Sequence, residues 1–299
     1  MRKISYILPL LLLLASCGSK KNSGEKKELS IAVSIAPIAW VTKQIVGDDV
    51  KITTIADKDP TALHNEVEKI KAISKSTHFF QILMPYEQQW VPKFKEKNSS
   101  LEVVHVGDNI EYIGGCGHPH HNHGHGHGHS HGHDHDHSSG DPHIWTSIKN
   151  LKIIADNIKD AVTKYDPDNK EKYEQNYKKL LVKLNSVNAK LEEILGPKKG
   201  KAFMVYHPAW TYLAKDFGLH QLPIEHEGKE PSPKALEGLI EAAKENNIKI
   251  ICVQPQFPYS ASEKVAEAIG AKVITLDPLL ENLDENLINV AKTLSQHME

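Results

Sequence analysis

The sequence lacks the features that mark several large classes of protein. Its 299 residues include only 3 Cys, too few for a disulfide-stapled scaffold. It has no excess of one charge, since 36 Lys and Arg face 38 Asp and Glu, which argues against a nucleic-acid partner. Catalytic signatures are missing too: there is no His-Glu-x-x-His run, no Gly-x-Ser-x-Gly elbow and no phosphate loop. The composition therefore favours a soluble globular protein that is not an enzyme.

Long apolar runs are also scarce. The run Ile4–Ala15 is shorter than the roughly 20 residues that a membrane-spanning helix needs. Arg2 and Lys3 precede it, and Leu14-Ala15-Ser16-Cys17 follows the pattern of a bacterial lipobox. We expect residues 1–16 to be a lipoprotein signal peptide and Cys17 to carry a lipid that anchors the protein to the membrane outside the cytoplasm. The alternative is a plain signal peptide in which Cys17 is incidental.

Histidine is the abundant residue, with 19 in the chain. Most of them fall between His118 and His137, where His alternates with Gly, Asp and Ser. Such a low-complexity stretch has almost nothing apolar to bury, so residues 114–140 are expected to form a mobile His-rich loop. Flexible imidazoles can bind metal weakly at many places, since each bound ion must order its ligands.

The rest of the chain has the pattern of an α/β protein with two lobes. Eight short β-rich runs alternate with helical patterns, which predicts parallel sheets flanked by helices. The expected strands are Leu29–Ile35, Lys51–Ala56, His78–Leu83, Glu102–Gly107, Lys201–Tyr206, Gln221–Glu225, Lys249–Val253 and Lys272–Leu276. After a polar tether at 17–28, we expect an N-terminal lobe over 29–167 and a C-terminal lobe over 196–299, each with a roughly four-stranded sheet.

A single long helix is predicted between the lobes, over residues 168–195. Apolar residues recur there from Tyr173 to Ile194 at steps of 4 and 3, which indicates one seam on a helix. Asp166-Pro167 opens the segment and Gly196-Pro197 ends it. The same seam would also suit a coiled-coil dimer, although it has barely four heptads. We expect a monomer.

Four residues with metal-binding side chains lie where an α/β protein binds ligands, near the carboxyl ends of strands or at a helix start. They are His64, His143, His207 and Asp277. Three imidazoles and one carboxylate suit a closed four-ligand site for Zn²⁺, with Mn²⁺ or another divalent transition metal less favoured. Each residue also has a plainer interpretation: a lone His is often a surface group, Asp277 can start a turn, and Asp141 can cap a helix beginning near His143.

Several motifs together resemble the zinc and manganese solute-binding lipoproteins of ABC importers. They are Asp141-Pro142-His143-Ile144-Trp145, Tyr206-His207-Pro208-Ala209-Trp210, Gln254-Pro255-Gln256-Phe257 and Leu276-Asp277-Pro278. The resemblance extends from Leu29 onward and is closest to the zinc branch, where a His-rich loop is frequent. It implies two α/β lobes joined by a rigid helix, a metal in the cleft with His143, His207 and Asp277 as ligands, and delivery to the transmembrane subunit of a permease.

One corner of the site departs from the family pattern. The family has His directly after the Pro of its first motif, and here that position is Thr61. His64 lies three residues later, on the same face if a helix begins there, so it can replace the missing ligand. The alternative is a position completed by water, with Glu225 and Glu227 as weaker substitutes.

We therefore expect a high-affinity zinc receptor of an ABC importer. A surface metal store or adhesin would explain the anchor and the His-rich loop but not the paired residues at strand ends. A metallohydrolase would need an open metal position and a general base.

Overall fold

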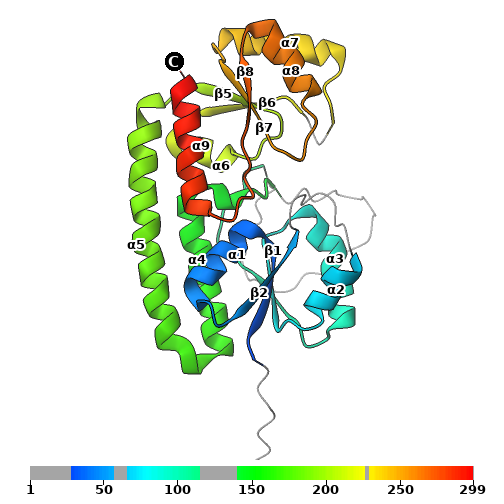
Figure 1. Cartoon of the computed structure of the whole chain (residues 1–299), viewed down its shortest axis with the longest axis vertical. Coiled ribbons are helices and arrows are strands. Elements are labelled where there is room, and N and C mark those ends of the chain that lie inside the picture. Colours follow the sequence, from blue (N-terminus) through cyan, green and yellow to red (C-terminus); the bar gives the residue numbers. More distant parts are fainter. Residues whose placement is uncertain (1–27, 57–65, 115–139, 226–228, 299) are drawn as a thin grey trace, which may run out of the picture.

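The computed structural model describes residues 28–56, 66–114, 140–225 and 229–298. Within them, two α/β lobes lie one above the other beside a long helix (Figure 1). Cys17, His64 and the His-rich residues 115–139 lie outside the described residues, as do the signal peptide and nearly all of the tether.

The first lobe is built on a four-stranded parallel sheet in the order β2-β1-β3-β4. Its strands are β1 (Ser30–Ile35), β2 (Lys51–Ala56), β3 (His78–Gln81) and β4 (Glu102–His105). Its helices are α1 (Ala36–Val46), α2 (Glu66–Ile73) and α3 (Pro85–Lys97). The central strand β1 is almost wholly buried, in keeping with its Ile-Ala-Val-Ser-Ile sequence.

The second lobe repeats this design with a parallel sheet in the order β6-β5-β7-β8. Its strands are β5 (Ala202–Val205), β6 (His220–Pro223), β7 (Ile250–Val253) and β8 (Lys272–Thr275). Its helices are α6 (Thr211–Phe217), α7 (Pro233–Glu245), α8 (Ser260–Ile269) and α9 (Leu283–His297). All eight expected strands form, and the predicted fold class is confirmed; their ends lie within two residues of the expected ones.

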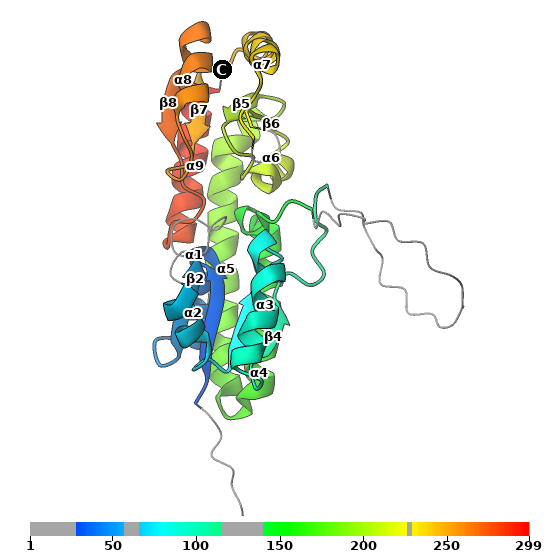
Figure 2. The same cartoon turned by 90° about the vertical axis from the view of Figure 1, so that its right-hand side faces the viewer.

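The predicted linking helix is α5 (Lys170–Leu195), which runs along both lobes (Figures 1 and 2). A short 3₁₀ turn at Pro167–Asn169 precedes it, and another begins at Gly196. Its buried stripe is the expected seam, formed by Tyr173, Leu180, Leu184, Val187 and Leu191. The stripe packs against α1, α9 and the preceding helix α4 (Ile148–Tyr165). The seam is thus covered within the chain and is closed to a coiled-coil partner.

One apolar core continues from the first lobe into the second. It includes the first sheet, α4, α5 and α9, and it reaches one face of the second sheet through Phe203, Val205 and Cys252. The alternate residues Met204, Ile251 and Val253 face a smaller cluster on the other side, under α7 and α8. Among the described helices, none has an apolar stretch of the length needed to cross a membrane.

Candidate metal centre

The ends of several strands from both lobes meet around one cavity of about 440 Å³. Met84 follows β3 in the first lobe, while His207 and Gln254 follow β5 and β7 in the second. His143 reaches the cavity from the turn that precedes α4. The cavity therefore lies where parallel sheets place their ligand sites, and its walls come from both lobes.

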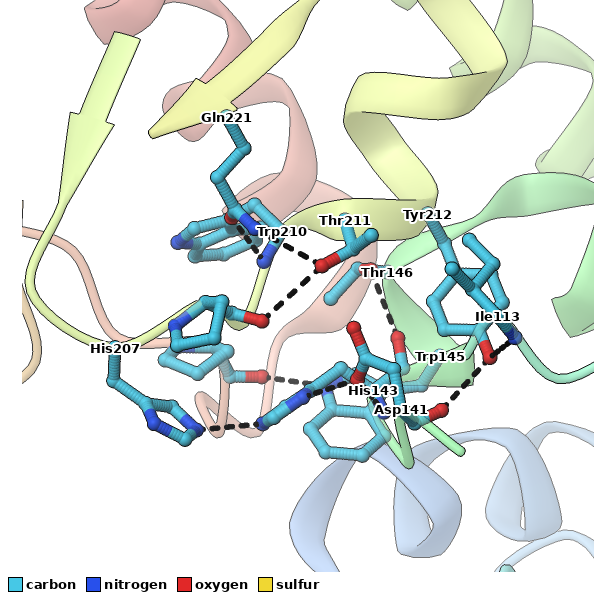
Figure 3. Close-up of polar contacts among 12 residues, drawn as sticks. Ile113, Asp141, His143, Trp145, Thr146, His207, Trp210, Thr211, Tyr212 and Gln221 are labelled. Atoms are coloured by element: carbon cyan, nitrogen blue, oxygen red, sulfur yellow. Dashed lines mark hydrogen bonds and ion pairs between the residues drawn. The ribbon is translucent and has the colours of Figure 1, made fainter. Parts of the chain in front are cut away.

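Two histidines from different lobes face each other in this cavity. Nε2 of His143 lies 3.3 Å from Nε2 of His207, and their rings meet edge to face (Figure 3). His143 is only 8% exposed. The sequence predicted both residues as ligands, and the structure brings them together although they stand far apart along the chain.

Each histidine is held through its other ring nitrogen by a carboxylate. Nδ1 of His143 donates to Oδ1 of Asp141 at 2.6 Å, and Nδ1 of His207 donates to Oε1 of Glu225 at 2.6 Å. Because a carboxylate only accepts, the proton of each neutral ring is on Nδ1 and a lone pair is on Nε2. Carboxylates bound in this way fix the tautomer and orientation of metal-binding histidines.

The distance between the two Nε2 atoms matches that between two nitrogen ligands of one zinc ion. Zn–N bonds of about 2.0–2.1 Å at a tetrahedral angle put two ligand nitrogens about 3.3 Å apart. Two facing lone pairs cannot bond to each other, whereas one cation between them satisfies both. The geometry of the pair therefore suits a tetrahedral divalent ion.

Further contacts fix the positions of the two rings. The ring of Phe257 stacks on His207 with centroids 4.9 Å apart. Nε2 of Gln254 donates to the backbone oxygen of His207 at 2.9 Å, and Oγ1 of Thr146 donates to that of His143 at 2.9 Å. These contacts reduce the entropy that must be lost when a metal is bound.

The electrostatics of the centre favour a cation. Burial raises the pKa of Asp141, but the hydrogen bonds that it accepts from the ring and the backbone of His143 lower it, so this pKa lies below its usual value. Glu225 is 5% exposed. Two carboxylates behind two neutral imidazoles supply the charge that balances a buried divalent ion.

The remaining predicted ligands do not join the histidine pair in the described residues. Asp277 follows β8; its Oδ1 accepts from the backbone N–H of Leu279 at 2.9 Å, and its backbone oxygen accepts from Asn286 at 2.8 Å. Within the described ranges, no three His, Cys, Asp or Glu side chains are placed so that they could hold one metal ion together. His64, Thr61 and Glu227 lie outside them. The full ligand set therefore stays a prediction.

The roles of Asp141 and Glu225 differ from those that the sequence indicated. Asp141 was the candidate cap of a helix, but its Oδ1 accepts from both the backbone and the ring of His143. Glu225 was a weak substitute ligand, and it is the partner of His207 instead. An Asp two residues before a His is a usable local signal, whereas Glu225 meets His207 only because β6 pairs with β5.

A buried carboxylate shapes the first-lobe wall of the cavity. Leu83 has φ of 65°, an unfavourable conformation for a residue with a side chain. The carboxylate of Glu87 accepts from the backbone N–H groups on both sides of it, those of Ile82 and Met84, and from Oγ of Ser34. Burial raises the pKa of Glu87 to about 7 against the lowering effect of these hydrogen bonds. Glu87 thus holds the turn that presents Met84 to the cavity.

Comparisons with known proteins agree with this architecture. The family described as "Zinc-uptake complex component A periplasmic" matches residues 31–299. The high-affinity zinc uptake system protein ZnuA of Bacillus subtilis is 33% identical over 278 residues, which are 90% of this chain and 85% of that protein. The zinc-binding lipoprotein AdcA of Streptococcus pneumoniae is 30% identical, over 95% of this chain and 56% of its own length. A crystal structure of ZnuA superposes with a TM-score of 0.80 at 32% identity, covering 90% of this chain and 99% of that one.

Proposed function

The chain belongs to the family of periplasmic zinc-uptake complex component A proteins, and on this premise we propose that it is an extracytoplasmic zinc receptor. It binds one Zn²⁺ between its lobes and delivers it to the transmembrane permease of an ABC importer. The family consists of solute-binding receptors rather than enzymes, and the zinc ion is cargo.

The observation that carries this proposal is the pair of Nε2 atoms 3.3 Å apart, each on a ring held by a carboxylate. Both rings keep a lone pair for the metal, and their spacing is that of two ligands of one tetrahedral ion. Imidazole ligands favour zinc over manganese, which prefers oxygen.

His64 and Asp277 complete the ligand set in this proposal. Asp277 has the support of its position after β8, beside Pro278 and Leu279, which line the cavity. The assignment of His64 as a ligand rests on its spacing from Thr61 alone. Cys17 carries the lipid that keeps the receptor at the membrane, near its permease.

The test is the zinc affinity of single-ligand variants. His143→Ala or His207→Ala should each weaken binding at least tenfold, about 1.4 kcal/mol, because each removes one metal–nitrogen bond. His220→Ala is the matched control, since His220 is exposed at the start of β6. Titration calorimetry that gives wild-type affinity for both ligand variants would overturn the proposal.

The same assay decides between His64 and water. If His64 is a ligand, His64→Ala costs as much as His143→Ala, and adding Thr61→His restores part of the loss. If water completes the site, His64→Ala is neutral and Thr61→His alone tightens binding.

A further inference from the structure

We propose that Trp145 is a positioning residue that holds the turn of Asp277 in place, so that this carboxylate can complete the zinc site. The inference rests on the proposed function. Trp145 belongs to the first lobe and is fully buried. Its Nε1–H donates to the backbone oxygen of Pro278, in the second lobe, at 2.9 Å.

Trp145 lies between the histidine pair and the turn. Its ring is 5.1 Å from that of His143, measured between centroids, and it lines the cavity together with Pro278. The hydrogen bond therefore fixes the distance between the first-lobe ligand and the residue that follows Asp277. A buried N–H without an acceptor costs about 1–3 kcal/mol, so the indole favours this one position of the turn.

The turn is held from its other side as well. Nδ2 of Asn286, on α9, donates to the backbone oxygen of Asp277 at 2.8 Å. The backbone oxygens of two successive residues are thus fixed by different lobes. Within the described residues Asp277 does not converge with the histidines, and its Oδ1 accepts from Leu279. With the backbone held, rotation of the side chain is the movement that brings the carboxylate to the metal.

A second buried indole offers a matched control for Trp145. Trp210 is 1% exposed, follows His207 by three residues and is similarly packed. Its Nε1 has no hydrogen-bond partner among the described residues. Burial of a tryptophan in this protein therefore does not by itself require a bond between the lobes, and Trp210 serves as the control for loss of ring volume.

The experiment is a double-mutant cycle on zinc affinity, measured by competition with a chelator. We expect Trp145→Phe to weaken zinc binding about tenfold in the wild-type background and to have no further effect once Asp277→Ala is present. Trp210→Phe should leave the affinity unchanged. Benzothienylalanine at position 145, which keeps the ring shape but lacks the N–H, should reproduce the effect of Phe without the change in packing.

The outcomes separate this inference from the proposed function. An equal loss from Trp145→Phe with and without Asp277, or no loss with benzothienylalanine, would show that Trp145 only fills space. If Asp277→Ala binds zinc as the wild type does, Asp277 is not a ligand and the inference fails, while the histidine pair stands. Failure of the proposed function, in contrast, would appear as unchanged zinc affinity in both His143→Ala and His207→Ala.

Discussion

The chemistry of the centre depends on which nitrogen of each imidazole carries the proton. In both histidines a carboxylate 2.6 Å from Nδ1 settles that choice and leaves Nε2 to the metal. In the proposed zinc site, Asp141 and Glu225 therefore act on the metal without touching it: they orient the rings and make them stronger electron donors. Affinity should then depend on the charge of these carboxylates as well as on the histidines.

Replacement of Glu225 by Gln tests this dependence. Gln can still accept the Nδ1–H of His207 but brings no charge, so zinc affinity should fall about tenfold, the lower end of what such partners contribute. Glu230→Gln, at an exposed carboxylate five residues later, should leave it unchanged. Equal affinity for both variants would mean that Glu225 does not act through the metal.

The buried carboxyl group of Glu87 predicts a pH effect on stability. Its pKa rises from 4.5 to about 7 in the folded state, chiefly because it is buried. Between these values the folded protein binds the proton more tightly than the unfolded chain, so stability is present at low pH and is lost as the pH rises. The loss amounts to about 3 kcal/mol at roughly 1.4 kcal/mol per pKa unit.

Urea unfolding of Glu87→Gln and of the wild type at pH 5 and pH 8 measures this effect. The variant should gain stability relative to the wild type at the higher pH, because Gln has no proton to lose. A difference between the two proteins that is the same at both pH values would show that the carboxyl group titrates normally.

The two histidines of the site could be predicted from the sequence, whereas the carboxylate partner of His207 could not. His143 and His207 were predicted because each stands beside Pro near the boundary of an element, where α/β proteins place ligands. The partnership of His207 with Glu225 requires the sheet order, in which β6 lies next to β5. Periodicity predicts that strands exist but not which of them are neighbours, so this contact could not be predicted.

Among the elements, α5 has the strongest sequence signal and the clearest structural outcome. A seam at steps of 4 and 3 between Asp166-Pro167 and Gly196-Pro197 predicted its bounds closely. The strands were also predicted, but several of their ends were placed one or two residues too far, because residues just past a strand can stay apolar and buried after they leave the ladder. Ile82 and Val106 are fully buried beyond the ends of β3 and β4.

The seam of α5 allows a matched test of its contribution. Leu184 is fully buried on the seam, and Val182, on the same helix, is 69% exposed. Leu184→Ala should lower the free energy of unfolding by about 2–5 kcal/mol through lost contacts and a cavity. Val182→Ala should change it by no more than about 0.5 kcal/mol. Urea titrations of both variants provide the measurement, and similar values would contradict the assignment of the seam to the core.

At the scale of the whole molecule, the two lobes share one continuous apolar core. The main core continues through α4, α5 and α9 into the second sheet. The sequence did not predict this continuity, because each half of it has the pattern of a complete α/β unit. Hydrogen bonds also cross between the lobes near the metal centre. Oγ of Ser147 donates to Asp216 at 2.6 Å, and Tyr212 Oη donates to the backbone oxygen of Asp141 at 2.7 Å. The histidine pair therefore lies beside hydrogen bonds that join the two lobes.

Hydrogen bonds also join the two described ends of the chain that flank the His-rich segment. The backbone N–H of Asp141 donates to the oxygen of Ile113 at 2.8 Å, and the N–H of Ile113 donates to Oη of Tyr212 at 3.0 Å. Gly114 and Gly140, the described residues that flank this segment, have φ of 77° and 74°, a left-handed conformation that favours glycine. Both flanks of the segment are thus hydrogen-bonded to the folded core, and we expect the geometry of the nearby His143 to be independent of the residues in between.

Deletion of residues 118–137 should accordingly preserve the principal zinc site. The short linker that remains joins two ends already bonded to each other, at little cost in loop entropy. Calorimetry should show one tight ion with wild-type affinity and the loss of several weak ions bound by the deleted imidazoles. A surface metal store would respond in the opposite way, by losing nearly all of its zinc. A deletion protein that binds no zinc at micromolar concentration would place the principal site in the His-rich segment, and the histidine pair would then need another explanation.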